Sequence, residues 1–449
     1  MQMLRKGGFS GELIPVNPKG GEIFGLPART SLAEIEGPLD LAVVVIRPDL
    51  IPETVREAGL AGHKNILVLP GGFAEAGPEG LARDAELRRI AAEHGVTIAG
   101  PNCAGIVHLR EGSRFAATFL RDLPPGGGLA FVSQSGAIAE EVIAKANEIE
   151  LKFGTIISLG NAMRIGVEDY LEFLGADETV SAIVLYIESL EDPQRFREVA
   201  RRVAAKKPVI AFMGGRTAAG AAAAAAHTGA VANDDSTIET FCRDSGVLRV
   251  RSLREMLLAS KGFGTFPMGL GRRALVLSNS GGPGVICTDA AALAGLELPD
   301  LPNSMATIMR AELPGEAAVA NPIDLLADAR EERFALTLDL ALEHARDTYD
   351  AILMIHVVPF MVDPVPVIAA MAERARATDM PILHAMMGTL PDKDSWFATM
   401  ETAGVPMFNN VEEMAACAGM LAAYPALRVS AEEAMRRNDD APVTLKGRG

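Results

Sequence analysis

The sequence contains few cysteines and few large aromatic residues. Its 449 residues include one tryptophan, four tyrosines and four cysteines, which are Cys103, Cys242, Cys287 and Cys417. The cysteines are far apart and form no metal-binding spacing, so the sequence predicts neither a disulfide framework nor a metal site. The scarcity of aromatic side chains argues against a platform on which nucleic-acid bases stack. This cysteine usage fits a reducing compartment.

The sequence also lacks an excess of positive charge and any long apolar run. Its formal net charge is −16, whereas proteins that bind nucleic-acid phosphates concentrate lysine and arginine. No stretch approaches the roughly 20 consecutive apolar residues that a membrane span needs. The first residues lead directly into glycine and polar residues, without the apolar core of a signal peptide. We therefore expect a cytoplasmic protein that binds neither nucleic acid nor membrane.

Short apolar runs alternate with helical stretches along the whole chain. Runs at residues 39–46, 129–132, 182–187, 274–277 and 351–357 are typical of strands buried on both faces of a parallel sheet. The amphipathic stretches between them give the β-α-β order of a doubly wound fold. In such folds the ligand-binding loops lie at the carboxyl ends of the strands. The predicted fold class is therefore α/β.

Two linkers rich in proline and glycine, at residues 123–128 and 262–271, divide the chain. They predict three doubly wound domains at residues 1–125, 126–265 and 266–430, followed by a polar tail at residues 431–449. A dinucleotide-type domain opens with a strand and a glycine-rich turn. This sequence instead opens at what we interpret as the end of the first helix, with the next strand at residues 12–16. We expect the first strand and glycine-rich loop of this Rossmann-like domain to be missing.

Two segments, at residues 131–137 and 277–284, run from a strand through small and hydroxyl residues into a helix start. In the first, Ser133 and Ser135 can cap the helix while its exposed N–H groups point at an anion. In the second, Pro283 suits the first helical turn, and the glycines let a ligand approach closely. Each segment alone fits an ordinary strand-to-helix turn equally well, but the pair favours phosphate binding. The candidate phosphate-binding residues are Ser133, Gln134, Ser135, Gly136, Ala137, Gly281, Gly282 and Gly284.

His227 follows a run of alanines, and an imidazole presented in this way can carry a phosphoryl group. The alternative is a structural residue of the core or of a helix end. Glu188 follows a buried strand, and a carboxylate beside an imidazole fixes its tautomer and makes the neutral ring a better nucleophile. Glu188 also fits a solvated surface residue. Gly160 and Asn161 follow another buried strand and are expected at the same ligand edge.

Several motifs occur together, in order, from the first residues to about residue 425. They are Pro15-Val16-Asn17-Pro18-Lys19, Gly100-Pro101-Asn102-Cys103-Ala104-Gly105, Ser133-Gln134-Ser135-Gly136-Ala137, Gly160-Asn161, His227-Thr228-Gly229-Ala230, Gly281-Gly282-Pro283-Gly284 and Asn321-Pro322-Ile323-Asp324. In this combination the sequence resembles the α subunit of ADP-forming (NDP-forming) acyl-CoA synthetases, which are relatives of succinyl-CoA synthetase.

The resemblance implies a Rossmann-like CoA-binding domain followed by two flavodoxin-like ligase domains. It implies that an acid and phosphate form an acyl-phosphate, which CoA attacks to give the thioester. A histidine relays phosphoryl groups between this site and the nucleotide, which binds to an ATP-grasp β subunit. His227 falls on the phosphohistidine position, and Glu188 falls on the carboxylate that orients it. The helix starts at residues 133–137 and 281–284 fall on the two helices whose dipoles face the phosphohistidine, and we call these two segments the first and the second cradle.

The resemblance also implies sites for CoA and for the acid. Lys19 falls where a lysine meets a CoA phosphate, and Arg47 lies in a turn along the pantetheine arm, where the family usually has a small residue. Cys103 lies near the thiol end of CoA, where we interpret it as a packing residue and not as a nucleophile. The expected CoA-binding residues are Asn17, Lys19, Val45, Arg47, Pro48, Asn102 and Cys103, and the expected substrate-binding residues are Gly160 and Asn161.

The sequence contains no ATP-grasp domain, so we expect ATP, ADP and Mg²⁺ to bind through a partner subunit in a hetero- or homo-oligomer. The chain alone is then inactive in ATP-dependent turnover. The acyl substrate stays open. An alternative function is a non-catalytic regulatory module that binds CoA or acyl-CoA, although an intact His227 argues against it. A nicotinamide dehydrogenase is disfavoured because the fingerprint glycines and the acidic ribose ligand are missing.

Overall fold

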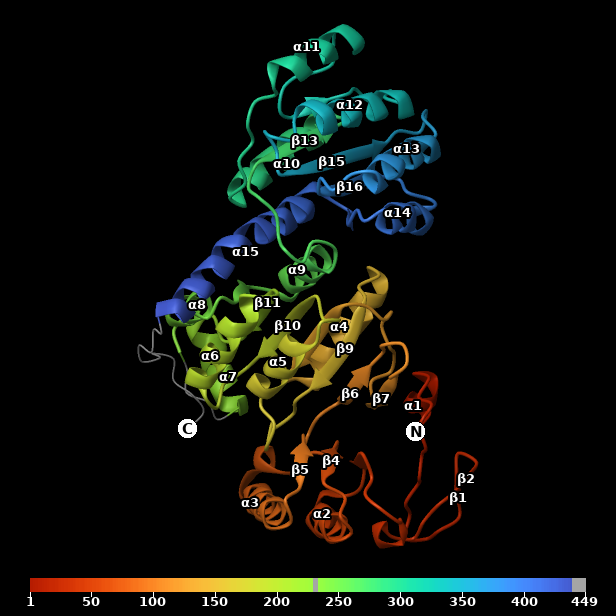
Figure 1. Ribbon diagram of the computed structural model, residues 1–449, viewed down its shortest axis with the longest axis vertical. Helices are drawn as coiled ribbons and strands as arrows, with labels where there is room; N and C mark the ends of the chain where they lie inside the picture. The colour runs from red at the N-terminus through yellow and green to blue at the C-terminus, as the bar shows by residue number, and fades with distance from the viewer. Residues whose placement is uncertain (229–232, 438–449) are drawn as a thin grey trace. The chain divides into compact units, whose positions relative to one another are not determined.

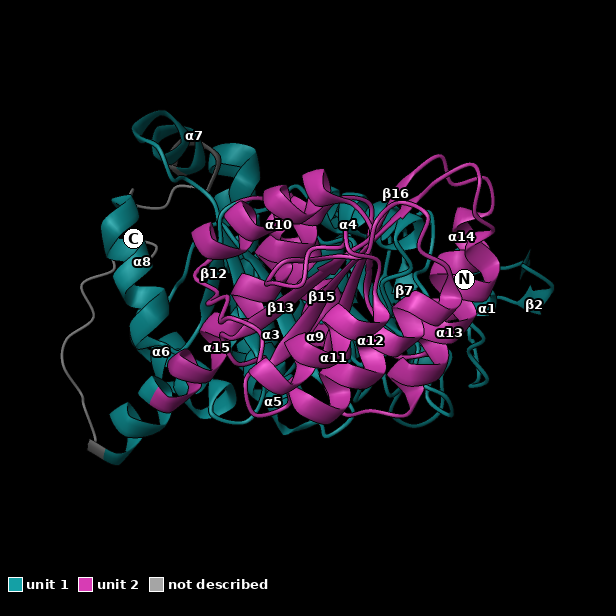
Figure 2. Ribbon diagram, turned by 90° about the horizontal axis from the view of Figure 1, so that it is seen from above, with its two compact units in different colours: residues 1–251, 430–449 teal, residues 252–429 magenta. Residues whose placement is uncertain are grey.

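The computed structural model describes residues 1–228 and 233–437, without the side chains of residues 225–228 and 437. The chain divides into two compact units, which are shown in different colours in Figure 2. Unit 1 consists of Met1–Arg251 together with the residues from Ser430 onward, and unit 2 is Ser252–Val429. The two units are described separately below.

The first part of unit 1 contains a three-stranded parallel sheet in the order β3-β4-β5. Helices α2 and α3 pack on each other, and the core includes Ile51, Val55, Leu87 and Ile90. We predicted a strand at residues 12–16, and this is wrong, because Val16 forms only an isolated bridge with Arg29. The elements are α1 (Gln2–Lys6), β1 (Glu22–Ile23), β2 (Leu26–Pro27), η1 (Leu32–Glu34), β3 (Ala42–Val44), η2 (Pro48–Leu50), α2 (Ile51–Leu60), β4 (Asn65–Val68), η3 (Ala74–Ala76), α3 (Gly77–His94) and β5 (Thr97–Ala99).

The second part of unit 1 is a seven-stranded sheet in the order β12-β11-β10-β8-β9-β6-β7. Its first five strands run parallel, whereas β6 and β7 join its edge as antiparallel strands. The residues of β8 and β9 are all buried, as expected for strands covered on both faces. The elements are β6 (Gly105–His108), β7 (Phe115–Thr118), β8 (Leu129–Ser133), α4 (Gly136–Glu148), β9 (Phe153–Ser158), α5 (Val167–Ala176), β10 (Ala182–Ile187), α6 (Pro193–Ala204), β11 (Val209–Met213), α7 (Ala218–Thr228), α8 (Asp235–Asp244) and β12 (Leu248–Val250).

Unit 2 contains a five-stranded parallel sheet in the order β14-β13-β15-β16-β17. Figure 1 shows helices packed along the strands of this sheet, as in unit 1. The elements are α9 (Leu253–Thr265), β13 (Ala274–Ser278), α10 (Gly281–Leu293), α11 (Asn303–Glu312), β14 (Ile323–Asp324), α12 (Glu331–His344), β15 (Ala351–Val358), α13 (Pro364–Arg376), β16 (Ile382–Gly388), α14 (Lys393–Thr402), β17 (Met407–Phe408) and α15 (Val411–Arg437), whose residues from Ser430 onward belong to unit 1.

Helix α15 is the one described helix long and apolar enough to cross a membrane, judged by length and composition alone. Half of its apolar window is buried inside the protein. Leu421 and Tyr424 are fully buried, and Tyr424 packs edge-on against Phe263. The helix therefore has the packing of a core helix, which meets the same criteria of length and composition.

The predicted fold class is confirmed. Each unit is built on parallel strands connected by helices, which is the α/β architecture that the alternating apolar runs indicate. The carboxyl ends of β8, β9, β10 and β11 lie at one edge of the unit 1 sheet. This edge carries the predicted site residues Ser133, Gly160, Asn161 and Glu188.

Candidate functional site

The first cradle lies where β8 turns into α4. Ser135 is the N-cap of α4, and its Oγ accepts a hydrogen bond from the N–H of Ile138 (3.4 Å). The Ser133 hydroxyl donates to the Ser135 carbonyl (2.7 Å) and accepts from the Ser135 N–H (3.2 Å). Within the part of the chain that the structure describes, the N–H groups of Gly136 and Ala137 have no acceptor. The cradle therefore offers two free donors and the positive end of the helix dipole to an anion.

Gln134 lies between the two serines, but its side chain faces the loop that follows β10. Its Oε1 accepts hydrogen bonds from the N–H groups of Glu188 (2.5 Å) and Ser189 (3.0 Å). Its Nε2 donates to the Ser189 carbonyl (2.7 Å), and its main-chain N–H donates to the Tyr186 carbonyl (3.2 Å). The predicted carboxylate, Glu188, is therefore attached through its main chain to the start of the cradle.

Tyr186 is a site residue that the sequence reasoning missed. Its hydroxyl is hydrogen-bonded to the half-buried Glu188, and burial together with the charge of Glu188 raises the pKa of the phenol. Its ring packs edge-on against Phe212 of β11 (5.6 Å between centroids). A signal was present in the sequence, because residues two apart on a strand point to the same face.

His227 lies in α7, but its side chain is outside the described residues, as are Gly229 and Ala230. The segment that leads to α7 starts at the same sheet edge as the cradle. Gly214, the first residue after β11, donates its N–H to the carbonyl of Ile187 (3.2 Å), the residue before Glu188. A Cβ built on Gly214 would lie 4.0 Å from the Tyr186 hydroxyl. The polypeptide thus passes the Tyr186–Glu188 pair directly before it enters α7.

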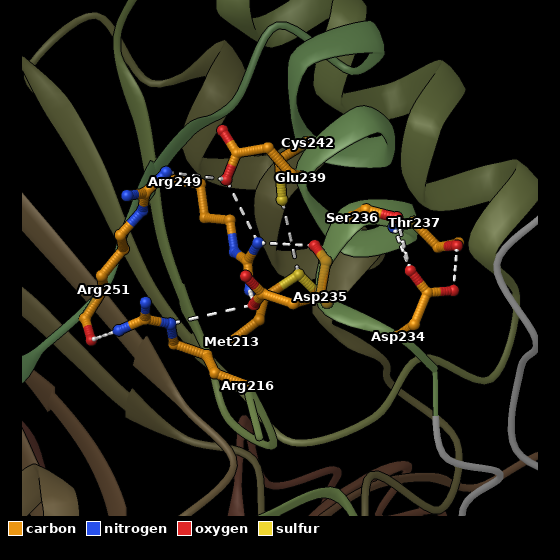
Figure 3. Close-up of polar contacts among 10 residues, drawn as sticks. All are labelled: Met213, Arg216, Asp234, Asp235, Ser236, Thr237, Glu239, Cys242, Arg249 and Arg251. Carbon is orange, nitrogen blue, oxygen red and sulfur yellow. Dashed lines mark hydrogen bonds and ion pairs between the residues drawn. The ribbon is translucent and has the colours of Figure 1, made fainter. Parts of the chain in front are cut away.

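A cluster of charged residues connects the loop before α7 with α8 and β12 (Figure 3). Arg216, just before α7, lies 3.8 Å from the carboxylate of Asp235 in α8 and donates to the Arg251 carbonyl (2.9 Å). The buried guanidinium of Arg249 pairs with Asp235 and with Glu239 (3.1 Å). Because Asp235 is shared by Arg216 and Arg249, the start of α8 is tied to the loop that precedes α7.

The start of α8 is also capped. Asp234 accepts hydrogen bonds from the Thr237 N–H (2.9 Å) and from the hydroxyls of Ser236 (2.6 Å) and Thr237 (2.5 Å). The bonds from Ser236 and Thr237 lower the pKa of Asp234. The ionised carboxylate interacts favourably with the N-terminal end of the helix dipole, so this N-cap stabilises the first turn of α8.

The predicted CoA loop and substrate loop are joined by side-chain amides. Asn102 has a positive φ of 57°, and its Nδ2 donates to Oδ1 of Asn161 (3.2 Å). Asn161 in turn donates to the carboxylate of Glu75 (2.5 Å), which also accepts from the N–H of Phe73 (3.1 Å). Burial opposes the ionisation of Glu75, but the hydrogen bonds from Asn161 and the main chain outweigh it and lower its pKa. Sequence reasoning did not find Glu75.

Main-chain contacts bring the same two loops together. Asn161 donates its N–H to the Pro101 carbonyl (2.9 Å), and the Ser158 hydroxyl accepts from the Ala104 N–H (2.9 Å). Gly160 has φ +59°, and a Cβ there would lie 2.2 Å from the Pro101 oxygen. A Cβ on Gly136, at the start of α4, would lie 3.3 Å from Cβ of Ala104. The predicted CoA loop therefore lies directly beside the first cradle.

The other predicted CoA-binding residues occupy varied environments. Asn17 accepts from the N–H of Lys19 (3.0 Å), and Lys19 is exposed. Arg47 is exposed and pairs with Asp49 (3.2 Å). Cys103 is buried with its thiol 3.4 Å from the Val68 carbonyl, and burial raises its pKa to about 11, as expected for a packing residue. Two more complete the set: Val45 is exposed, and Pro48 lies close to Gly72.

In unit 2, the turn from β13 into α10 has the same hydrogen-bonding geometry as the first cradle, but a different residue lies beside it. The Ser278 hydroxyl donates to the Ser280 carbonyl (2.8 Å) and accepts from its N–H (3.0 Å). Asn279 occupies the position that Gln134 has in unit 1, and its amide exchanges two hydrogen bonds with the main chain of Val357 (2.8 and 2.9 Å). Val357 thus stands where unit 1 has Glu188. This repeat has a valine in place of a carboxylate.

The start of α10 carries the predicted Gly281, Gly282 and Gly284. Gly284 donates its N–H to the Ser280 carbonyl (3.2 Å), whereas the N–H groups of Gly281 and Gly282 have no acceptor in the described chain. A Cβ on Gly281 would lie 3.0 Å from Oδ2 of Asp324. The Asp324 carboxylate therefore lies beside the second cradle, where it offsets part of the positive potential of the helix.

Comparisons with known proteins agree on one family. Family models match as a CoA binding domain (residues 1–109), a succinyl-CoA ligase like flavodoxin domain (126–263) and a Ligase-CoA domain (274–424). The acetate–CoA ligase (ADP-forming) II subunit alpha of Pyrococcus furiosus is 35% identical over 91% of this chain and 89% of its own length. The chain belongs to the ADP-forming acyl-CoA ligase family. It is an α-type chain of an acid–thiol ligase, as the motifs predict.

Other members of the ADP-forming acyl-CoA ligase family differ in length. Acetate–CoA ligase (ADP-forming) I of Archaeoglobus fulgidus is 36% identical over 75% of this chain, which covers 48% of that protein. The dinucleotide-forming acetyl-coenzyme A synthetase 1 of Ca. Korarchaeum cryptofilum, solved with phosphate and ADP, superimposes with a TM-score of 0.90 at 28% identity, covering 97% of this chain and 93% of that chain. The chain thus spans about half the length of several curated relatives.

Among the described residues, no group of three or more histidine, cysteine, aspartate or glutamate side chains is placed to hold a metal ion. The donor set of the cradle consists of N–H groups and hydroxyls, which suits an anion and not a cation.

Proposed function

We propose that this chain joins a carboxylic acid to CoA by way of a phosphohistidine at His227 and an acyl-phosphate, together with an ATP-grasp β subunit that binds ATP and Mg²⁺. The observation that carries the proposal is the grouping at the carboxyl edge of the unit 1 sheet. The free N–H groups of Gly136 and Ala137, the fixed carboxylate of Glu188 and the predicted CoA loop at Asn102 meet there. Family membership supports the same reaction.

In the proposed reaction, the His227 imidazole attacks the γ-phosphorus of ATP, and the bond to the β-phosphate oxygen breaks to release ADP. A carboxylate oxygen of the acid then attacks the phosphorus of phosphohistidine, and the P–N bond breaks to return the imidazole and give an acyl-phosphate. The CoA sulfur attacks the acyl carbon, and the C–O bond to phosphate breaks. The products are a thioester and inorganic phosphate, which takes up the thiol proton.

The residues of unit 1 have separate roles in this sequence. The N–H groups of α4 hold the phosphoryl oxygens, because unpaired amides at a helix start stabilise negative charge without reorganisation. Glu188 would accept a hydrogen bond from the N–H of one imidazole nitrogen, which leaves the other nitrogen free to attack phosphorus. Ser133 and Ser135 keep the start of α4 in place, as their mutual hydrogen bonds indicate.

We propose that CoA lies along the carboxyl edge of the three-stranded sheet. The exposed Lys19 would meet a CoA phosphate, the turn at Arg47 would lie along the pantetheine arm, and the thiol would end beside Asn102, next to the cradle. Gly160 and Asn161 line the same place and are assigned to the acid. On this assignment the domains are residues 1–125, 126–265 and 266–430, and the protein acts in the cytoplasm as an oligomer with its β subunit.

The acid is proposed to be small. Acetate is the natural first substrate to test, because the names of the most similar relatives specify acetate or acetyl-CoA. Discrimination among small acids rests on apolar contacts worth only about 1 to 3 kcal/mol each. A panel of acids is therefore needed to define the preference.

The proposed function is tested by combining the purified chain with an ATP-grasp subunit from the same genome. ATP, Mg²⁺, CoA and acetate or another small acid should give one ADP for each acyl-CoA, and neither chain alone should turn over. Glu188→Gln should lower the rate by roughly 10²-fold, because an amide orients an imidazole less well than a carboxylate does. Release of AMP, or full activity without the partner, would refute the proposed function.

A further inference from the structure

Gln134 occupies the middle of the Ser-Gln-Ser turn, but its side chain makes no contact directed into the cradle among the described residues. All its side-chain hydrogen bonds go to the main chain of Glu188 and Ser189. We propose that Gln134 is a positioning residue that acts through Glu188, by locking the carboxylate to the same helix start that holds the phosphoryl group. This inference rests on the proposed function, since it assigns a task within the phosphohistidine site.

The main chain at Glu188 needs hydrogen bonds from outside the sheet, because β10 ends at the residue before it. Ser133 of β8 and Tyr186 of β10 are the last paired residues between these strands. Beyond them the main chain of β10 has no strand partner on the β8 side, so its N–H groups need another acceptor. The Gln134 amide supplies one, because its Oε1 accepts from two successive N–H groups and its Nε2 returns a bond to the Ser189 carbonyl. The side chain thereby extends the ladder by two residues.

The position of the amide matters because Glu188 is half-buried and its carboxylate is bonded to Tyr186. Tyr186 restrains the head of the side chain, and Gln134 restrains its main chain. Two restraints at opposite ends of one side chain fix its direction, whereas either alone leaves rotation about the side-chain bonds. A displacement of about 1 Å in a catalytic arrangement can cost roughly 10²-fold in rate.

Unit 2 gives an internal comparison. Asn279, whose side chain is one methylene shorter than that of glutamine, exchanges both of its side-chain hydrogen bonds with Val357. Val357 has no carboxylate to orient. Both cradles thus have an amide side chain at this position. Gln134 binds two successive residues, Glu188 and Ser189, and the first of these has a carboxylate where unit 2 has Val357.

The test uses the complete α and β complex and measures the single-turnover rate of His227 phosphorylation across a pH series. Gln134→Met keeps the length of the side chain but removes both hydrogen-bonding groups, and it should label roughly 10- to 100-fold more slowly, with an altered pH profile. Gln134→Asn should be slowed less, because Asn279 shows that the shorter amide still holds one residue. The control is Gln2→Met, the same substitution at an exposed position of α1 in the same unit. It should label like the unmodified protein.

The deciding measurement is the double variant Gln134→Met with Glu188→Gln. If Gln134 acts through Glu188, the double variant labels no more slowly than Glu188→Gln alone, because residues that act as one unit are not additive. If Gln134→Met slows labelling by its full factor in both backgrounds, or in neither, the inference is overturned. If Gln134→Met fails to fold, the pH profile of Gln134→Asn decides, and a profile identical to that of the unmodified protein overturns the inference. Unmodified protein that is not labelled at His227 refutes the proposed function instead.

Discussion

Gly160 shows how closely the two loops of the proposed CoA and acid site approach each other. Its φ of +59° is a left-handed conformation, and a Cβ would lie 2.2 Å from the Pro101 oxygen and 2.5 Å from the Asn102 oxygen. Both neighbours are main-chain atoms, which cannot move without displacing the loop. Glycine is therefore required there for two reasons, its conformation and its lack of a side chain.

We predict that Gly160→Ala destabilises unit 1 by about 3 kcal/mol and raises the KM for CoA, because the loop at Asn102 must move. The matched control is Gly95→Ala at the end of α3, where φ is +60° but a Cβ would meet no atom within 4 Å. That variant should lose only about 1 kcal/mol, for the left-handed conformation alone. Denaturant unfolding and CoA titration of the rate compare them, and equal losses would contradict the steric account.

Strands β15 and β16 carry two buried histidines. Neither ring nitrogen of His356 or His384 has a hydrogen-bond partner in the described structure, and the rings stack 6.3 Å apart. Burial lowers the pKa of His356 to about 4, and burial together with the charge of His356 lowers the pKa of His384 well below its usual range. The core of unit 2 therefore holds both imidazoles in their neutral form.

This arrangement predicts that unit 2 loses stability in mild acid. The unfolded histidine binds a proton below about pH 6.5 and the folded His356 only near pH 4, so stability is complete above the first value and falls toward the second. Between pH 6.5 and 5 the loss from His356 is about 2 kcal/mol. His384 adds a loss of the same sign.

Tryptophan fluorescence can follow this loss, because the single tryptophan of the chain, Trp396, lies in α14 of unit 2. Urea unfolding at pH 7 and pH 5 should show a lower midpoint at pH 5. A variant with both His356→Phe and His384→Leu should lose most of that difference. A double variant as acid-sensitive as the unmodified protein would show that other groups cause the loss.

The sequence predicts most strands of these sheets, because strands buried on both faces are continuous apolar runs such as residues 182–187. It misplaces a strand at residues 12–16, where the described structure has only an isolated bridge between Val16 and Arg29. It also gives no indication that β6 and β7 join the sheet of β9. That pairing is antiparallel and depends on contacts between distant parts of the chain.

The candidate site follows the same rule. Glu188 and the serines of the cradle are predictable, since each lies at the carboxyl end of an apolar run. The task of Gln134 is not, because it depends on β8 lying next to β10, more than 50 residues away in sequence. The same holds for Glu75, whose carboxylate accepts a hydrogen bond from Asn161, 86 residues away in sequence. Long-range pairing, and not local pattern, decides these contacts.

At the scale of the whole molecule, the chain contains an anion cradle and a proposed phosphoryl carrier but spans about half the length of several relatives. The proposed function assigns the nucleotide to a separate ATP-grasp subunit. His227 would then serve both chains, as the acceptor for one reaction and the donor for the next. Both phosphoryl transfers of the proposed function therefore depend on this one side chain.

The most direct test incubates the chain and its ATP-grasp partner with ATP labelled in the γ-phosphate. We predict that the α chain becomes labelled and that the label is stable at high pH and lost at low pH. Addition of the carboxylic acid substrate and CoA should remove the label from the protein, giving labelled phosphate and acyl-CoA. His227→Ala should abolish the label in a chain that folds like the unmodified protein. A His227→Ala chain that is still labelled would contradict the account.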